Sequence, residues 1–258
     1  MGAGSNARTR SWYLDPVAAQ QKRQVHQAWV RAALPEAVTG IALKTDLFEE
    51  AYGADRIFDD LFPHSRLSLG LDRDEGTVGR ASGHWPTPRS RDRLQAMVCD
   101  VRRLALRDSC VDAIVSTSTL DHFQSRREIE NSLDELCRVL RPGGTLLITL
   151  DNPRNLLYSL LRWWSSTRWA PVQLGATASL EELEEMLASR GFADLRGEYL
   201  IHNPRGISTL LFLGLRKLLG RFADLPIRTL LMIFAVAGRL PLKSLTGCFV
   251  GVAAVKKT

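Results

Sequence analysis

Residues 111–153 constrain the fold more than any other part of the chain. In order, this segment holds an apolar run, a polar stretch, an amphipathic stretch, a Pro-Gly-Gly turn and a second apolar run. Strands that alternate with helices at this spacing form a parallel sheet with right-handed crossovers. The polar stretch, 116–122, follows the first strand, at the end where parallel α/β sheets bind ligands. We therefore expect an α/β protein with its site at that edge.

The same alternation extends over most of the 258 residues. Apolar runs typical of strands occupy 38–43, 66–71, 94–99, 111–116, 145–150, 196–201 and 247–256. Helical periodicity occupies 17–34, 47–61, 129–140 and 179–190. The pattern predicts a Rossmann-like, mostly parallel sheet of about seven strands, with helices on both faces and a helical insertion before the last strand.

The chain divides into a tail and one large domain. Residues 1–11 are predicted to be a disordered basic tail without the apolar core of a secretory signal, and 12–258 form the domain. Within it we distinguish an aromatic segment at 154–178, expected on the acceptor side, and an apolar helical insertion at 203–246. Four scattered cysteines without zinc spacing favour the reducing cytoplasm.

The chain is basic, with a formal net charge of +6. Such a balance suits anionic surroundings, although an arginine-rich proteome explains it equally well. There is no dense Lys/Arg run with interleaved aromatic residues, so we expect no nucleic-acid partner.

Polar groups follow four of the predicted strands. They are Lys44, Thr45 and Asp46 after the first, Asp72 after the second, Asp100 and Val101 after the third, and residues 116–122 after the fourth. Parallel strands bring these ends to one edge of the sheet. A carboxylate after the second strand can accept hydrogen bonds from a ribose diol, and one after the third can accept from the amine of adenine. The set therefore indicates an adenosine-containing ligand.

At these positions the chain resembles the class I S-adenosylmethionine-dependent methyltransferases. The resemblance rests on GLD at 70–72, CDVRRLAL at 99–106, VDAIVS at 111–116, TLDHF at 119–123, LCRVLRPGGTLLIT at 136–149 and LDNPRN at 150–155. It implies that S-adenosylmethionine is the cofactor. Its methionine end would contact Lys44, Thr45 and Asp46, its ribose Asp72, its adenine Asp100 and Val101, and Ser116 or Thr117 would close over it.

The chain departs from this family at the first loop. The family has a glycine-rich loop there, whereas this chain reads ALKTDLFEEAYG, with glycine only at Gly53. Glycines allow a close backbone approach to the ligand. The sequence is consistent either with an altered donor pocket, in a subgroup with LKTDLFEEA, or with a pocket that no longer binds the donor.

Structural roles remain open for the same side chains. Asp46 can cap the helix that begins at Leu47, and Asp72 and Asp100 can be ordinary strand-end caps. Lys44 can be a solvated surface charge.

Methyl transfer needs alignment of the nucleophile, the methyl carbon and sulfur, and a hydroxyl acceptor also needs a base. Asp121 and His122 lie at the expected edge for this, although His122 can instead cap the next helix or pack in a turn. His202 is a weaker second base. Asp151 and Asn152 can bind a polar substrate or merely form a turn. No metal-ligand cluster is visible, so we expect a metal-free reaction.

Two apolar helical stretches, 207–222 and 227–237, are too short to cross a bilayer. Burial within the protein is the default expectation for such a pair, and contact with a membrane surface or with a second subunit is the alternative.

Together these features predict O-methylation of a small-molecule, glycan or lipid-linked acceptor, in the cytoplasm or on the inner face of the membrane. The competing hypothesis is an inactive relative that serves as a membrane- or protein-binding module. A nicotinamide-dependent oxidoreductase is disfavoured because the G-x-G-x-x-G turn is absent.

Overall fold

A computed structural model of the chain describes residues 15–34, 38–53, 58, 63–84, 93–167, 174–204 and 206–258. The predicted tail 1–11 lies outside the described residues.

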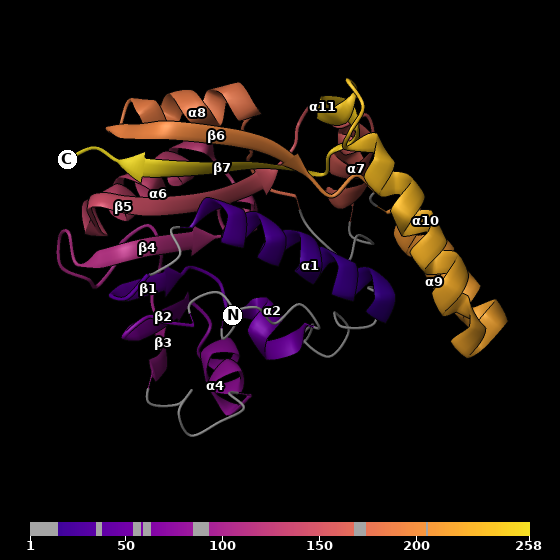
Figure 1. Ribbon diagram of the computed structural model, residues 1–258, viewed down its shortest axis with the longest axis horizontal. Helices are drawn as coiled ribbons and strands as arrows, with labels where there is room; N and C mark the ends of the chain where they lie inside the picture. Colours follow the sequence, from indigo (N-terminus) through magenta and orange to yellow (C-terminus); the bar gives the residue numbers. More distant parts are fainter. Residues whose placement is uncertain are drawn as a thin grey trace.

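The described chain forms one seven-stranded sheet with the order β3-β2-β1-β4-β5-β7-β6 (Figure 1). The strands are β1 Ile41–Lys44, β2 Leu67–Asp72, β3 Leu94–Val98, β4 Val111–Ser116, β5 Leu140–Asp151, β6 Phe192–Leu200 and β7 Phe249–Lys256. Strands β1 to β5 pair in parallel, and β7 runs antiparallel to both β5 and β6. The predicted fold class is confirmed. The strand order reverses between β1 and β4, which is the switch point where such sheets bind ligands.

Helices cover both faces of the sheet, with α1 in front of it and α6 behind it in Figure 1. The α-helices are α1 Pro16–Ala33, α2 Phe48–Tyr52, α4 Glu75–Gly83, α6 Arg126–Val139, α7 Tyr158–Ser165, α8 Leu180–Ala188, α9 Ile207–Leu219, α10 Asp224–Ala237 and α11 Lys243–Thr246. Two 3₁₀ turns, η2 Leu120–His122 and η3 Gly220–Ala223, connect them.

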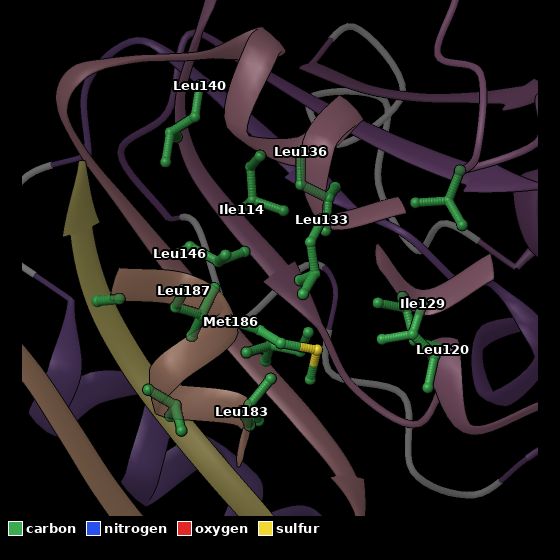
Figure 2. Close-up of a cluster of buried hydrophobic side chains, with 14 of the residues drawn as sticks. Ile114, Leu120, Ile129, Leu133, Leu136, Leu140, Leu146, Leu183, Met186 and Leu187 are labelled. Carbon is green, nitrogen blue, oxygen red and sulfur yellow. The ribbon is translucent and has the colours of Figure 1, made fainter. Parts of the chain in front are cut away.

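Strand β4 shows how one sequence serves both faces, because successive side chains of a strand point in opposite directions. Ile114 packs in a cluster with leucines of α6 and α8, which Figure 2 shows around Ile114 and Leu146. Its neighbours Ala113 and Val115 pack in a second cluster with Trp29 of α1. The sheet is therefore buried on both sides, as its near-continuous apolar strands require.

Two predicted boundaries differ from the structure. The helix expected at 47–61 is interrupted at Gly53, whose extended backbone conformation ends α2 at Tyr52, and Phe58 is helical again. Residues 54–57 and 59–62 lie outside the described residues. The Pro-Gly-Gly turn is part of β5, where the register with β4 shifts, and Gly143 has a φ of +74° that favours glycine.

The insertion before β7 is helical, as expected, but it is not buried. Helix α9 ends at Leu219, before Gly220 with its φ of +54°, and α10 begins at Asp224. Only a narrow side packs on the N-terminal part of α1, through Phe212, Ile227 and Leu231. The hairpin of α9 and α10 projects from the side of the sheet (Figure 1), so within this chain the expected burial is limited to that narrow side.

The fully buried leucines of α6 should carry much of the stability. Leu133 is completely buried between the helix and the sheet (Figure 2), so Leu133→Ala should lower the free energy of unfolding by about 2–5 kcal/mol in urea denaturation. The control is Leu160→Ala, whose side chain is exposed on α7 and should change it by less than about 0.5 kcal/mol. Equal effects would contradict this core.

Candidate functional site

A chain of hydroxyl groups joins the carboxyl ends of β1 and β4 at the switch point. The Thr45 hydroxyl donates to Ser116 Oγ at 2.9 Å, and Thr45 Oγ1 lies 2.8 Å from Thr119 Oγ1. The backbone N–H of Thr45 also donates to the Val115 carbonyl at 3.2 Å. These bonds hold the first loop against the polar stretch after β4, so two of the predicted donor residues lie together.

The last residue of β1 is a buried lysine. Lys44 donates through Nζ to the backbone carbonyl of Asp46 at 2.5 Å and lies 3.5 Å from Glu50 Oε1, with both side chains buried. Glu50 in turn accepts a hydrogen bond from the N–H of Phe58 at 2.9 Å. The alternative of Lys44 as a solvated charge is therefore wrong. The buried Lys44 side chain instead fixes the path of the first loop from inside the protein.

Leucine fills the space beside the first loop. Leu47 is completely buried, and a Cβ added at Gly70 of β2 would lie 2.5 Å from Leu47 Cδ2. The loop thus packs on β2 through a side chain, and a glycine on the neighbouring strand makes room for it. Any ligand at this edge would meet the side chains of the loop as well as its backbone.

The acids after β1 and β2 lie side by side. Asp72 accepts hydrogen bonds from the N–H of Leu47 at 3.3 Å and from that of Asp74 at 2.9 Å. Asp46 accepts from the N–H of Phe48 at 2.9 Å, so it caps the first turn of α2 as one alternative predicted. Burial raises the pKa of Asp46, and the negative charge of Asp72 raises it further.

Opposite charges act on Asp46 from two elements. Lys44 and His122 both lower the pKa of this carboxyl, without offsetting the effect of burial. His122, on the turn after β4, is therefore close enough to Asp46 to act on it electrostatically. The structure brings Lys44, Asp46, Asp72 and His122 to one edge of the sheet.

Asp100 already has a partner within the chain. Arg102 donates to both carboxylate oxygens, from its backbone N–H and its guanidinium group, and these bonds lower the pKa of Asp100. The guanidinium carbon of Arg102 also lies 5.0 Å from the ring centre of Phe123. Val101 is buried next to Asp100. Both lie after β3, beside β2, so their predicted contact with adenine stays a prediction.

The turn after β4 holds the two predicted catalytic residues and one that the sequence did not indicate. Asp121 is buried and His122 is exposed on η2, while Ser125 caps the following helix α6. Ser118 has a left-handed backbone with a φ of +51°, and its buried hydroxyl has no hydrogen-bond partner within the described chain. Strain of this kind is concentrated at functional sites, but it leaves no pattern in a sequence. Thr117 precedes it.

A second group of acids lies on the β5 side of η2. The side chain of Tyr158 on α7 is buried, and its pKa is raised by burial and then by the charges of Asp151 and Asp121. Gly175 donates to the Asp121 carbonyl at 2.9 Å, and a Cβ there would lie 2.2 Å from the Phe123 carbonyl oxygen. The segment predicted for the acceptor side therefore runs directly against the turn that carries His122.

Two predicted substrate residues hold the insertion in place. Asn152 donates through Nδ2 to the carbonyls of Ser244 at 2.7 Å and Gly247 at 2.9 Å. His202 lies 2.9 Å through Nδ1 from the Thr246 hydroxyl and 3.1 Å through Nε2 from the Tyr199 carbonyl, and burial lowers its pKa. Substrate contact by either residue stays a prediction.

In the described part of the chain, no three His, Cys, Asp or Glu side chains gather in a way that could hold a metal ion. No described helix has the length and apolar character needed to cross a bilayer.

Sequence comparison relates the chain to known methyltransferases. Residues 49–148 match the model of a methyltransferase domain. A probable S-adenosylmethionine-dependent methyltransferase of Mycolicibacterium smegmatis is 31% identical over 143 residues, which are 55% of this chain and 48% of that protein. A malonyl-[acyl-carrier protein] O-methyltransferase of Methylococcus capsulatus is 30% identical over 50% of this chain and 44% of its own length. The chain thus spans about half the length of the curated relatives it matches.

Structure comparison agrees. The structure is similar to that of phosphoethanolamine N-methyltransferase 2 of Haemonchus contortus in complex with S-adenosyl-L-methionine, with a TM-score of 0.59 and 19% identity. The superposition covers 100% of this chain and 61% of that protein chain. This likeness shows a shared fold. Together, the comparisons show that the chain is similar to S-adenosylmethionine-dependent methyltransferases, in sequence over about half of its length and in fold over the whole of it.

The raised pKa of Asp46 leads to a prediction about stability. A carboxyl whose pKa is raised by folding contributes fully to the stability of the folded state at pH values below its pKa in the unfolded chain. This contribution is lost as the pH rises through its pKa in the folded protein. Asp46→Asn should therefore raise the midpoint of thermal unfolding at pH 7. The difference should shrink as the pH falls below about 4, the usual pKa of aspartate.

Asp74→Asn is the matched control with the opposite sign. Hydrogen bonds from Thr77 lower the pKa of Asp74, so this variant should unfold at a lower temperature at pH 7 and converge with the wild type in acid. Shifts of the same sign in both variants would contradict the electrostatic account.

Proposed function

We propose that this protein transfers the methyl group of S-adenosylmethionine to an oxygen atom of a small-molecule, glycan or lipid-linked acceptor. The observation that supports it most is the arrangement of Asp46, Asp72 and His122, which three different connections bring to one edge at the switch point. Bound there, S-adenosylmethionine would supply an activated methyl group on a sulfonium sulfur.

The residues fit such a ligand by their chemistry. A sulfonium and an amino group favour the carboxylate of Asp46, whose charge is disfavoured by burial without a bound cation. Asp72 has one backbone donor on each oxygen, which leaves acceptor capacity for ribose hydroxyls. Thr45, Ser116 and Thr117 adjoin the methionine end, with Lys44 fixing the loop beneath, and Asp100 and Val101 lie toward the adenine.

On the acceptor side, His122 is the proposed base because it is exposed and close enough to Asp46 to act on it electrostatically. Asp121 is the buried acid next to it in sequence, and the buried Asp151 and Tyr158 are the polar groups proposed to favour hydroxyl-bearing acceptors. We do not propose a nucleic-acid acceptor, because the sequence lacks a dense basic run with interleaved aromatic residues. For location we propose the cytoplasm, with the inner face of the membrane as the site for a lipid-linked acceptor.

Donor binding is tested first. Isothermal titration with S-adenosylmethionine should give measurable heat, and Asp72→Ala should weaken binding by about 1.5–3 kcal/mol because a charged hydrogen bond to the ribose is lost. Asp134→Ala, which removes an exposed acid of α6, is the control and should bind normally. Absence of heat at millimolar donor would favour the inactive, module-like alternative.

The base is tested by turnover. His122→Ala should lower methyl transfer, measured as S-adenosylhomocysteine formed with an acceptor found by screening glycans and lipids, by roughly 10²–10⁴-fold at unchanged donor affinity. His64→Ala, in an exposed turn after residue 62, is the control. Full activity of His122→Ala would remove this residue from the mechanism.

A further inference from the structure

The free end of the α9–α10 hairpin presents large apolar side chains to solvent. Leu218 is 81% exposed and Leu225 73%, the two highest values among large hydrophobic residues in the described chain, and Phe222 between them is 72% exposed. All other exposed large hydrophobic residues except Val98 also lie between Leu156 and Leu242. A concentration of exposed apolar side chains in one segment is typical of an interaction site.

Helix α9 is oriented with its charged side toward the protein. Arg216 donates to the buried carboxylate of Asp15 at 2.8 Å and to Asp224 at 2.6 Å. On the other side, Ile207, Leu211 and Leu218 share one face of the helix by their spacing and are all exposed. The buried ion pair fixes this orientation, so the apolar face is held outward.

The exposed charges around the tip are mainly positive. The insertion 203–246 contains seven Lys and Arg residues and one acid, Asp224, so its net charge of +6 equals that of the whole chain. Lys217, Arg221 and Arg228 are exposed beside the apolar tip, and within the described chain none of the three forms an ion pair. Arg228 donates to Gln20 Oε1 at 3.4 Å, and the guanidinium carbon of Arg221 lies 5.1 Å from the ring centre of Phe222. Exposed apolar side chains next to cations that have no acidic partner match an anionic lipid surface.

We propose that the hairpin tip, defined as Leu218, Phe222 and Leu225 with Lys217, Arg221 and Arg228, docks on the surface of an anionic lipid bilayer. The apolar side chains enter the boundary between headgroups and acyl chains, and the cations contact lipid phosphates. The hairpin projects away from the sheet, so its tip can reach a surface before the catalytic domain does (Figure 1). This surface is separate from the transfer reaction.

A second copy of the chain is the less favourable occupant. A two-fold contact would place the same tip against itself, and Lys217, Arg221 and Arg228 would then face their own equivalents. Like charges at close range oppose that association. An anionic bilayer meets the same side chains with the opposite charge.

The test is flotation of the whole protein with vesicles in a density gradient. It should float with phosphatidylcholine vesicles that contain phosphatidylglycerol at low salt, and far less with pure phosphatidylcholine or in 0.5 M salt. Leu218→Asp with Phe222→Asp should lower partitioning at least tenfold, because a charge replaces apolar insertion. Lys217→Glu with Arg221→Glu should lower it by at least about 20-fold, since the loss of each cation accounts for about fivefold and each added acid is repelled by the anionic surface.

Val98→Asp is the matched control, because it places the same acid on an exposed apolar position of β3, outside the insertion. It should float like the wild type, and thermal unfolding should show that all variants are folded. The proposal is overturned if the wild type does not float with anionic vesicles, or if Val98→Asp loses flotation as much as the tip variants. A dimer in light scattering that dissociates in the tip variants, without flotation, would assign the tip to a second copy instead.

Discussion

The pairing of β1 with β4 is the contact on which the site depends. It sets two strands that are far apart in sequence next to each other, and their crossovers leave in opposite directions from that point. Asp46 and Asp72 therefore stand on one side, and the turn with Asp121 and His122 stands on the other. The hydroxyl chain of Thr45, Ser116 and Thr119 locks the two ends together, so the relative position of donor and acceptor groups follows from the sheet itself.

The first loop, which follows β1 at this switch point, is packed without the glycines that allow a close backbone approach. In place of a close backbone approach, Leu47 packs over Gly70, and Lys44 is held inside by Glu50 and the Asp46 carbonyl. Burying two charges costs desolvation energy that their attraction only partly offsets. Burial raises the pKa of Asp46, and the nearby positive charge of Lys44 does not offset this effect. A positively charged ligand would relieve that cost, so the electrostatics of the loop are more consistent with a donor site than with a decayed one.

Sequence patterns predicted the parts of this structure that depend on local periodicity and strand ends. The seven strands, the burial of both faces and the placement of Asp46 and Asp72 at one edge follow from apolar runs and from where they stop. The length of α2, the extent of β5 and the exposure of α9 do not follow from these patterns. Gly53 ends α2 through its own backbone conformation, whereas the register shift of β5 against β4 and the Asp15–Arg216 pair are tertiary contacts. The sequence did not indicate Ser118 either, because its left-handed backbone is a property of the folded turn.

Two side chains that are predicted to bind substrate also connect the sheet to the insertion. Asn152 at the end of β5 is bonded to Ser244 and Gly247, and His202 after β6 lies against Thr246. Arg216 joins the hairpin to the start of α1 through Asp15. The insertion is thus tied to the ends of β5 and β6 through residues 244–247, and α9 is tied to the start of α1. These polar contacts restrict how the hairpin is oriented relative to the sheet, so a surface bound at the tip would meet the domain in a restricted range of orientations.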